Sequence, residues 1–66
     1  MNIQINGKPE LVDDHFTAAQ LVESLALTGK RIAMEVNQEI VPRSQYSTYQ
    51  FKEDDQVEIV HAIGGG

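Results

Sequence analysis

The residues with the clearest chemical potential in this chain are its last three, Gly64, Gly65 and Gly66, which follow an apolar segment. Glycine has no Cβ, so such a tail can enter a narrow channel that any other residue would block. Another enzyme could activate the α-carboxylate of Gly66 and turn it into an acyl donor. The alternative interpretation of the same glycines is an inert, frayed terminus or a leftover linker.

The side chains offer little chemistry of their own. The chain has no cysteine, which excludes disulfides, thiolate metal sites and thiol nucleophiles. If the protein carries reactive sulfur, the terminal carboxylate is the group left to hold it. His15 follows Asp13 and Asp14 in what we interpret as a solvated loop, and His61 lies in the last apolar segment, as a half-exposed strand residue or a partner contact. We therefore predict neither a catalytic residue nor a metal site in this chain.

Size and charge narrow the possible functions. A chain of 66 residues supports one domain with a thin core, which favours a docking surface over an internal active-site cavity. The net charge of −5 argues against nucleic acid and anionic membranes as partners. We find no signal peptide and no apolar run of transmembrane length, so we expect a cytoplasmic protein. We also expect the protein to be a monomer when free.

The first half of the chain predicts a hairpin followed by a helix. Apolar residues alternate with polar ones from Met1 to Asn6, and Asn6-Gly7 is typical of a tight hairpin turn. A short second strand is expected over residues 10–12, with Pro9 restricting its start to an edge or first position. Thr17 and Gln20 have the spacing of a capping box, and apolar residues at helical spacing follow as far as Leu25. Gly29 is expected to end the helix.

The second half predicts three more strands. Alternation predicts a strand over residues 32–36, and a turn at residues 37–39 leads into a short strand that Pro42 stops. Residues 43–50 show no clear period, residues 52–55 are expected to form a turn, and the last strand covers residues 57–63. One helix can cover only one face of a sheet, so the fold class is two-layer α+β, with the first and last strands adjacent. This is the β-grasp pattern, with a domain over residues 1–63 and a flexible glycine tail over residues 64–66.

A partner-binding surface is expected on the sheet face turned away from the helix. Arg43 follows Pro42 in a turn, and arginine and tyrosine are frequent in interface hot spots. The alternative is that Arg43 is a plain surface residue above a tyrosine that closes a small core. The residues assigned to partner binding are Arg43, Tyr46, His61 and Ile63.

Two segments carry a resemblance to a known family. Residues 33–44, AMEVNQEIVPRS, resemble a segment of the thiamine-biosynthesis sulfur carrier proteins (ThiS), and residues 57–66, VEIVHAIGGG, look like that family's last strand and tail. The resemblance covers essentially the whole chain. Two departures are Tyr46, where many members have tryptophan, and a third glycine where two are typical.

The resemblance implies a specific sequence of reactions. A ubiquitin-activating-like adenylyltransferase would use ATP to adenylate Gly66, and sulfur derived from cysteine would convert it to a thiocarboxylate. Thiazole synthase would then take the sulfur into the thiazole ring. The chain would be a protein co-substrate without a bound cofactor. The alternatives are the sulfur carrier subunit of molybdopterin synthase, a ubiquitin-like modifier conjugated through Gly66, and an interaction domain with inert glycines.

Overall fold

The computed structural model describes residues 1–61, which contain five strands, one α-helix and one short 3-10 helix. In chain order these are β1 (Asn2–Ile5), β2 (Lys8–Leu11), α1 (Ala18–Ser24), β3 (Ile32–Val36), β4 (Glu39–Val41), η1 (Arg43–Gln45) and β5 (Gln56–His61). The predicted division into a domain over residues 1–63 and a tail over residues 64–66 stays a prediction, because residues 62–66 lie outside the described part.

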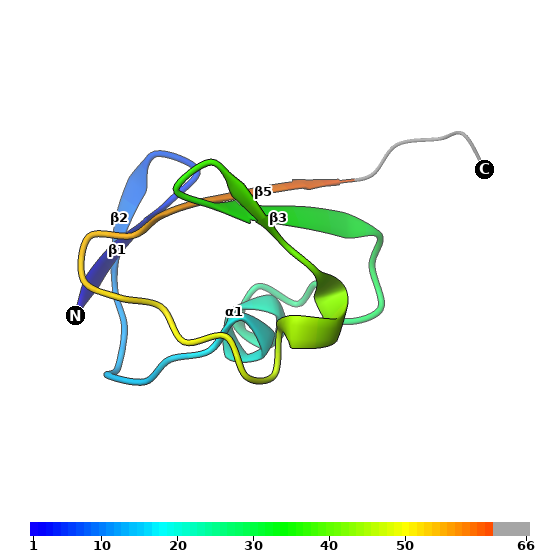
Figure 1. The fold of residues 1–66 in the computed structure, drawn as a ribbon, viewed down its shortest axis with the longest axis horizontal. Helices are drawn as coiled ribbons and strands as arrows, with labels where there is room; N and C mark the ends of the chain where they lie inside the picture. The colour runs from blue at the N-terminus through cyan, green and yellow to red at the C-terminus, as the bar shows by residue number, and fades with distance from the viewer. Residues whose placement is uncertain (62–66) are drawn as a thin grey trace.

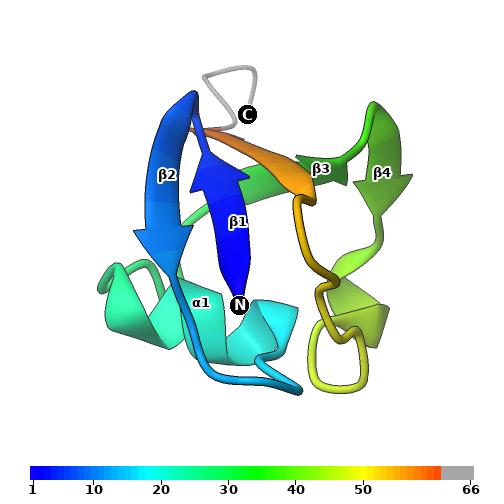
Figure 2. The same cartoon turned by 90° about the vertical axis from the view of Figure 1, so that its left-hand side faces the viewer.

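The strands form one mixed sheet in the order β2-β1-β5-β3-β4. β1 and β5 run parallel, and the other neighbouring strands are antiparallel. α1 lies across one face of the sheet, and Figures 1 and 2 show this two-layer arrangement from the side and from the end. The predicted α+β class and β-grasp arrangement are confirmed, as is the adjacency of the first and last strands.

The first hairpin follows from its turn residues. Asn6 and Gly7 have φ of 50° and 82°, the left-handed values that a two-residue hairpin turn requires. β2 starts at Lys8, earlier than predicted, and includes Pro9 opposite Gln4. A proline is tolerated there because β2 is an edge strand and has no neighbour on its outer side.

The helix begins as its sequence predicts. The Gln20 backbone N–H donates to the Thr17 hydroxyl (3.1 Å), and the Thr17 N–H donates to the Gln20 side-chain oxygen (2.8 Å). This is a complete capping box. Ala18 and Leu21 on the predicted apolar face are fully buried, so the local sequence fixes both the start of α1 and the side that faces the sheet.

The helix ends earlier than predicted. Its last residue is Ser24, and Ala26, not Gly29, takes the left-handed conformation, with φ of 58°. The N–H of Leu27 donates to the Val22 carbonyl (2.9 Å) and that of Ala26 to the Glu23 carbonyl (3.0 Å), the hydrogen-bond pattern of a Schellman motif. Gly29, with φ of 79°, belongs to the following turn, which the Lys30 N–H closes on the Leu27 carbonyl.

Replacing Ala26 by glycine is expected to stabilise the domain. An alanine in the left-handed region is strained by about 1–2 kcal/mol, and glycine removes this strain. Glycine also gives the unfolded chain more conformational freedom, which lowers the gain in stability by about 0.4–1 kcal/mol. Ala26→Gly should therefore raise the free energy of unfolding by about 0.5–1 kcal/mol in urea denaturation. A destabilised variant would show that Ala26 does not hold the left-handed cap in solution.

The second hairpin leads into a feature that the sequence did not predict. Asn37 and Gln38 have φ of 51° and 71° and connect β3 to β4 as a tight turn. After Pro42 the chain forms η1, within the stretch that had no clear period. Three residues are too short for a periodic pattern to appear.

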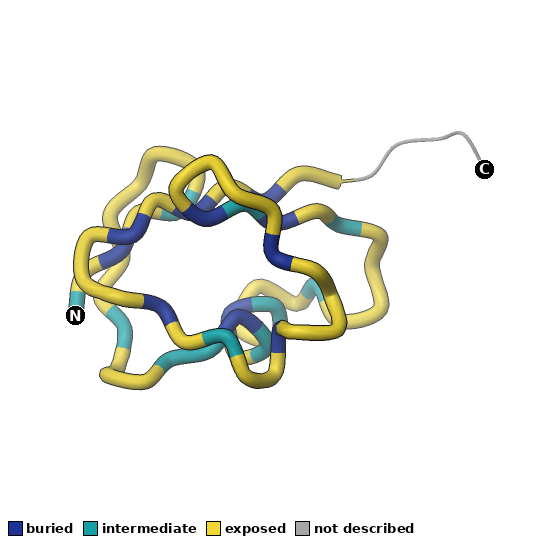
Figure 3. Tube along the Cα trace, viewed as in Figure 1, coloured by how far each residue is buried: buried dark blue, intermediate teal, exposed yellow. Residues whose placement is uncertain are grey.

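The core lies between the sheet and the helix layer. Figure 3 shows buried positions alternating with exposed ones along the strands. The largest fully buried side chains are those of Ile3, Leu21, Met34 and Val57. Met34 is therefore a core residue, as its alternation pattern predicted.

Two asparagine side chains from the hairpin turns hold the central strand β5. The Asn6 side-chain amide accepts from the Ile59 N–H (2.9 Å) and donates to the Ile59 carbonyl (3.3 Å). These two bonds take the place of the backbone hydrogen bonds that a neighbouring strand would make, at the point where β1 has ended. The Asn37 side-chain oxygen accepts from the Gln56 N–H (3.0 Å). These bonds fix the strand that leads to the C-terminal residues.

Candidate functional site

The predicted reactive residue, Gly66, lies outside the described residues, together with Ile63, Gly64 and Gly65. The structure describes the strand that leads to them. β5 overlaps β1 only at Gln56 and Val57 and then runs on beside β3 as far as His61, which is paired with Ile32. Figure 1 shows this strand extending toward the end of the molecule opposite Met1. The central strand of the sheet thus carries the chain to one end of the domain.

His61 is exposed at that end. It follows the alternation of Val57 and Ile59, whose side chains are buried on the helix side of the sheet. Its strand partner Ile32 is half-buried and packs against the core. His61 is therefore accessible, but it belongs to the helix side and not to the outer face where we expected it.

η1 begins at Arg43 and is followed by Tyr46. This short helix lies on the helix side of the sheet, beside α1 (Figure 1). The Arg43 guanidinium donates to the Lys30 carbonyl (2.8 Å). Tyr46 is 8% exposed and belongs to the core. The expectation that these two residues occupy the outer face of the sheet is wrong, because η1 turns the chain back toward the helix layer after β4. The burial of Tyr46 supports the interpretation of a tyrosine that closes the core.

Positive charge gathers around this end of the domain. Lys30 and Arg43 line a hollow of about 120 Å³ together with Ile32 and Tyr46. By contrast, acidic Asp14 and Glu53 lie beside the first two residues: Asp14 is 3.9 Å from the Met1 ammonium, and Glu53 accepts from the Asn2 N–H. An acidic chain therefore presents a cationic patch near His61.

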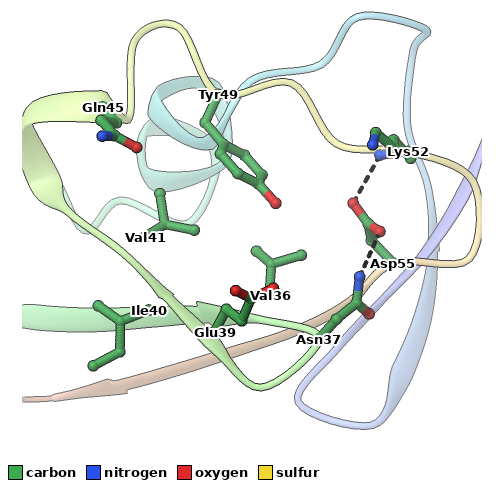
Figure 4. Close-up of a pocket in the computed structure, with 9 residues that line it drawn as sticks. All are labelled: Val36, Asn37, Glu39, Ile40, Val41, Gln45, Tyr49, Lys52 and Asp55. Carbon is green, nitrogen blue, oxygen red and sulfur yellow. Dashed lines mark hydrogen bonds between the residues drawn. The ribbon is translucent and has the colours of Figure 1, made fainter.

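A second hollow, of about 280 Å³, contains the buried acid Asp55 (Figure 4). Its carboxylate accepts from the Lys52 N–H (2.8 Å) and the Asn37 side chain (3.0 Å). Burial raises the pKa of the Tyr49 hydroxyl above its ordinary value, and the charges of Asp55 and Glu39 raise it further. The Asp55 bonds join the 52–55 turn to the second hairpin, so we interpret this acid as a structural group.

The described residues contain no cluster of side chains that indicates a reactive centre. Within residues 1–61, no three histidine or acidic side chains come together as a metal site. His15 lies in an exposed loop, with its ring nitrogen 3.2 Å from the Gln50 side chain. No helix in this part of the chain is long and apolar enough to cross a membrane.

Comparisons with known proteins place this chain in a family. A model of the ThiS family matches residues 3–66. A crystal structure of the thiamine biosynthesis protein ThiS from Geobacter metallireducens has a TM-score of 0.84 and 30% identity, with all of both chains covered.

Two curated relatives show different lengths. Sulfur carrier protein ThiS of Bacillus subtilis is 35% identical over 65 residues, which covers 97% of this chain and 98% of that protein. A protein named thiazole synthase from Magnetococcus marinus is 38% identical over 66 residues, but this chain spans only 20% of its length. Because the match covers nearly the whole sequence and the fold agrees, the chain belongs to the ThiS family.

Proposed function

We propose that this protein is a cytoplasmic sulfur carrier of thiamine biosynthesis that works through the carboxylate of Gly66. The observation that carries the proposal is the family match over residues 3–66, which includes the three glycines. The relative of nearly equal length is named a sulfur carrier protein. The absence of cysteine from the sequence is consistent with a carrier that holds sulfur on its terminus.

The proposed chemistry has three steps, all performed at partner enzymes. A carboxylate with a pKa near 3.5 is ionised and a poor electrophile at neutral pH, so it needs activation. An adenylyltransferase of the ubiquitin-activating type joins the Gly66 carboxylate to the AMP part of ATP and releases pyrophosphate. A sulfur nucleophile derived from cysteine, at the oxidation level of sulfide, then displaces AMP as the leaving group and leaves a thiocarboxylate, and thiazole synthase accepts that sulfur. The carrier is a monomer when free and binds no cofactor of its own.

The fused relative supports thiazole synthase as the acceptor. Its name and its length indicate that a domain like this one can occupy a fifth of a chain called thiazole synthase. A carrier joined to its acceptor needs no diffusional encounter, because the second binding event becomes intramolecular. We infer that the separate chain meets the same kind of acceptor.

The first step is tested by ATP–pyrophosphate exchange. The purified adenylyltransferase should exchange labelled pyrophosphate into ATP when this protein is added, and only slowly without it. Exchange that does not respond to the protein would contradict adenylation of Gly66.

Arg43 is expected to contribute to binding of the adenylyltransferase. It is an exposed cation at the end of the domain where β5 leaves, and truncating an interface arginine commonly costs more than about 1 kcal/mol. Arg43→Ala should therefore weaken binding by about fivefold to tenfold in calorimetry. It should leave the fold intact, since it removes one exposed hydrogen bond.

A matched control is Lys8→Ala, which removes the same charge from the edge strand β2. It should change the affinity far less than Arg43→Ala does. Equal effects of the two variants would indicate general electrostatic attraction and would remove Arg43 from the binding surface.

A further inference from the structure

The outer face of the sheet is not covered by any part of the described chain. α1 and η1 both lie on the opposite side, as Figures 1 and 2 show. Three large apolar side chains are nevertheless exposed at outward-facing strand positions: Leu11 on β2 is 79% exposed, Ile40 on β4 is 71% exposed and Val60 on β5 is 57% exposed. A face with such residues is a candidate protein-binding surface.

The strand register places two acidic residues directly opposite each other on this face. Glu35 of β3 pairs with Glu58 of β5, and on its other side Glu35 pairs with Ile40 of β4. In the next outward-facing row, Ala33 pairs with Val60. Residues opposite each other in neighbouring strands have Cβ atoms about 4.5–5.5 Å apart. The register therefore places the two glutamate side chains next to each other, bordered by apolar side chains.

Nothing in residues 1–61 neutralises this pair. The salt bridge found in that part of the chain joins Met1 to Asp14, and the hydrogen bonds between described residues leave both carboxylates without a donor. Arg31 lies four residues before Glu35 in the chain. At a rise of about 3.3 Å per residue, its backbone is about 13 Å from that of Glu35. Like charges directly opposite in a sheet are destabilising, so we expect the pair to weaken the isolated fold.

The chemistry of the face defines the side chain that would fit it. A guanidinium is planar, carries several N–H donors and can bridge two carboxylates while its flat surface rests on apolar neighbours. An ammonium offers a more localised charge and holds its water more strongly. The Glu35–Glu58 pair beside Ile40 and Val60 therefore suits an arginine that projects from an apolar surface.

We propose that the outer sheet face formed by Glu35, Glu58, Ile40 and Val60 docks on thiazole synthase, and that the two glutamates bind an arginine of that enzyme. This inference rests on the proposed function. The fused relative favours this occupant, because it places a domain of this family within a chain named thiazole synthase. The cationic patch around Arg43 lies on the opposite, helix side and stays available to the adenylyltransferase.

The test compares two double variants that remove the same charge. Glu35→Gln with Glu58→Gln removes the facing pair, whereas Glu10→Gln with Glu23→Gln removes two exposed acids from β2 and α1. The first variant should bind thiazole synthase about tenfold or more weakly in calorimetry. Its melting temperature should rise by about 1–5 °C, because the repulsion is gone. The second variant should bind nearly as the wild type does.

Weaker binding together with higher stability is the supporting result, because a purely structural role would move both properties in the same direction. Unchanged affinity of the facing-pair variant would overturn the inference. Equal weakening by both variants would also overturn it, as would an effect confined to the adenylyltransferase. Both variants keep the C-terminal glycines, so ATP–pyrophosphate exchange measures the proposed function separately. Normal exchange with unchanged synthase binding would refute the docking face alone.

Discussion

Adding one alanine after Gly66 is expected to lower the rate of adenylation by about a hundredfold or more. The extra residue moves the carboxylate by as much as about 3.6 Å and brings a Cβ into a channel that we expect to be shaped for glycine. A displacement of about 1 Å of a reacting group can already cost roughly a hundredfold in rate. ATP–pyrophosphate exchange with the extended protein measures the effect.

Deletions provide the control for this prediction. Removing Gly66 leaves Gly65 as a terminal glycine on a shorter tether, so adenylation should slow without being abolished. Removing both residues should slow it further, and the alanine extension should be worse than either deletion. An extended protein that reacts as fast as the native one would show that the terminal carboxylate is not the reactive group.

Leu21→Ala is expected to remove a large part of the domain's stability. Leu21 is 2% exposed and is the large side chain through which α1 enters the core. A buried leucine replaced by alanine typically costs about 3–5 kcal/mol, and a domain of this size has a total stability of roughly 3–10 kcal/mol. The melting temperature followed by circular dichroism should fall by about 15 °C or more.

Leu25→Ala is the matched control on the same helix. Leu25 is 42% exposed at the helix C-cap, so its truncation should cost less than about 1 kcal/mol. A loss at Leu21 as small as the loss at Leu25 would contradict the helix orientation described above. A fully unfolded Leu21→Ala variant should also fail to stimulate the adenylyltransferase, because the docking surfaces depend on the sheet.

The parts of the fold that could be predicted are those decided by local chemistry. Asn6-Gly7 specifies its turn through left-handed backbone angles, and Thr17 with Gln20 specifies the start of the helix. The alternation of Ile32, Met34 and Val36 gave the strand and its buried side. The order of the predicted strands and helix gave the β-grasp arrangement, and the resemblance of residues 33–44 and 57–66 gave the ThiS family; the comparisons confirm both.

The parts that could not be predicted depend on long-range placement. Glycine is preferred at helix ends, but the last turn of α1 closes with Ala26 in the left-handed position, through the N–H bonds of Ala26 and Leu27, and Gly29 takes part in the next turn. The side on which Arg43, Tyr46 and His61 lie depends on η1 and on the strand register, neither of which the sequence pattern revealed. The same register places Glu35 opposite Glu58, a pairing that their positions in the sequence do not disclose.

The mass of the protein after reaction tests the central claim most directly. The native chain would be incubated with ATP, the adenylyltransferase and a cysteine-derived sulfur donor, and then with thiazole synthase and its remaining substrates. We predict that the first incubation raises the mass by the difference between sulfur and oxygen, located at Gly66 by fragmentation, and that the second returns the mass to its starting value. An unchanged mass in the first incubation, or attachment of a whole partner protein, would contradict the account of this chain as a sulfur carrier.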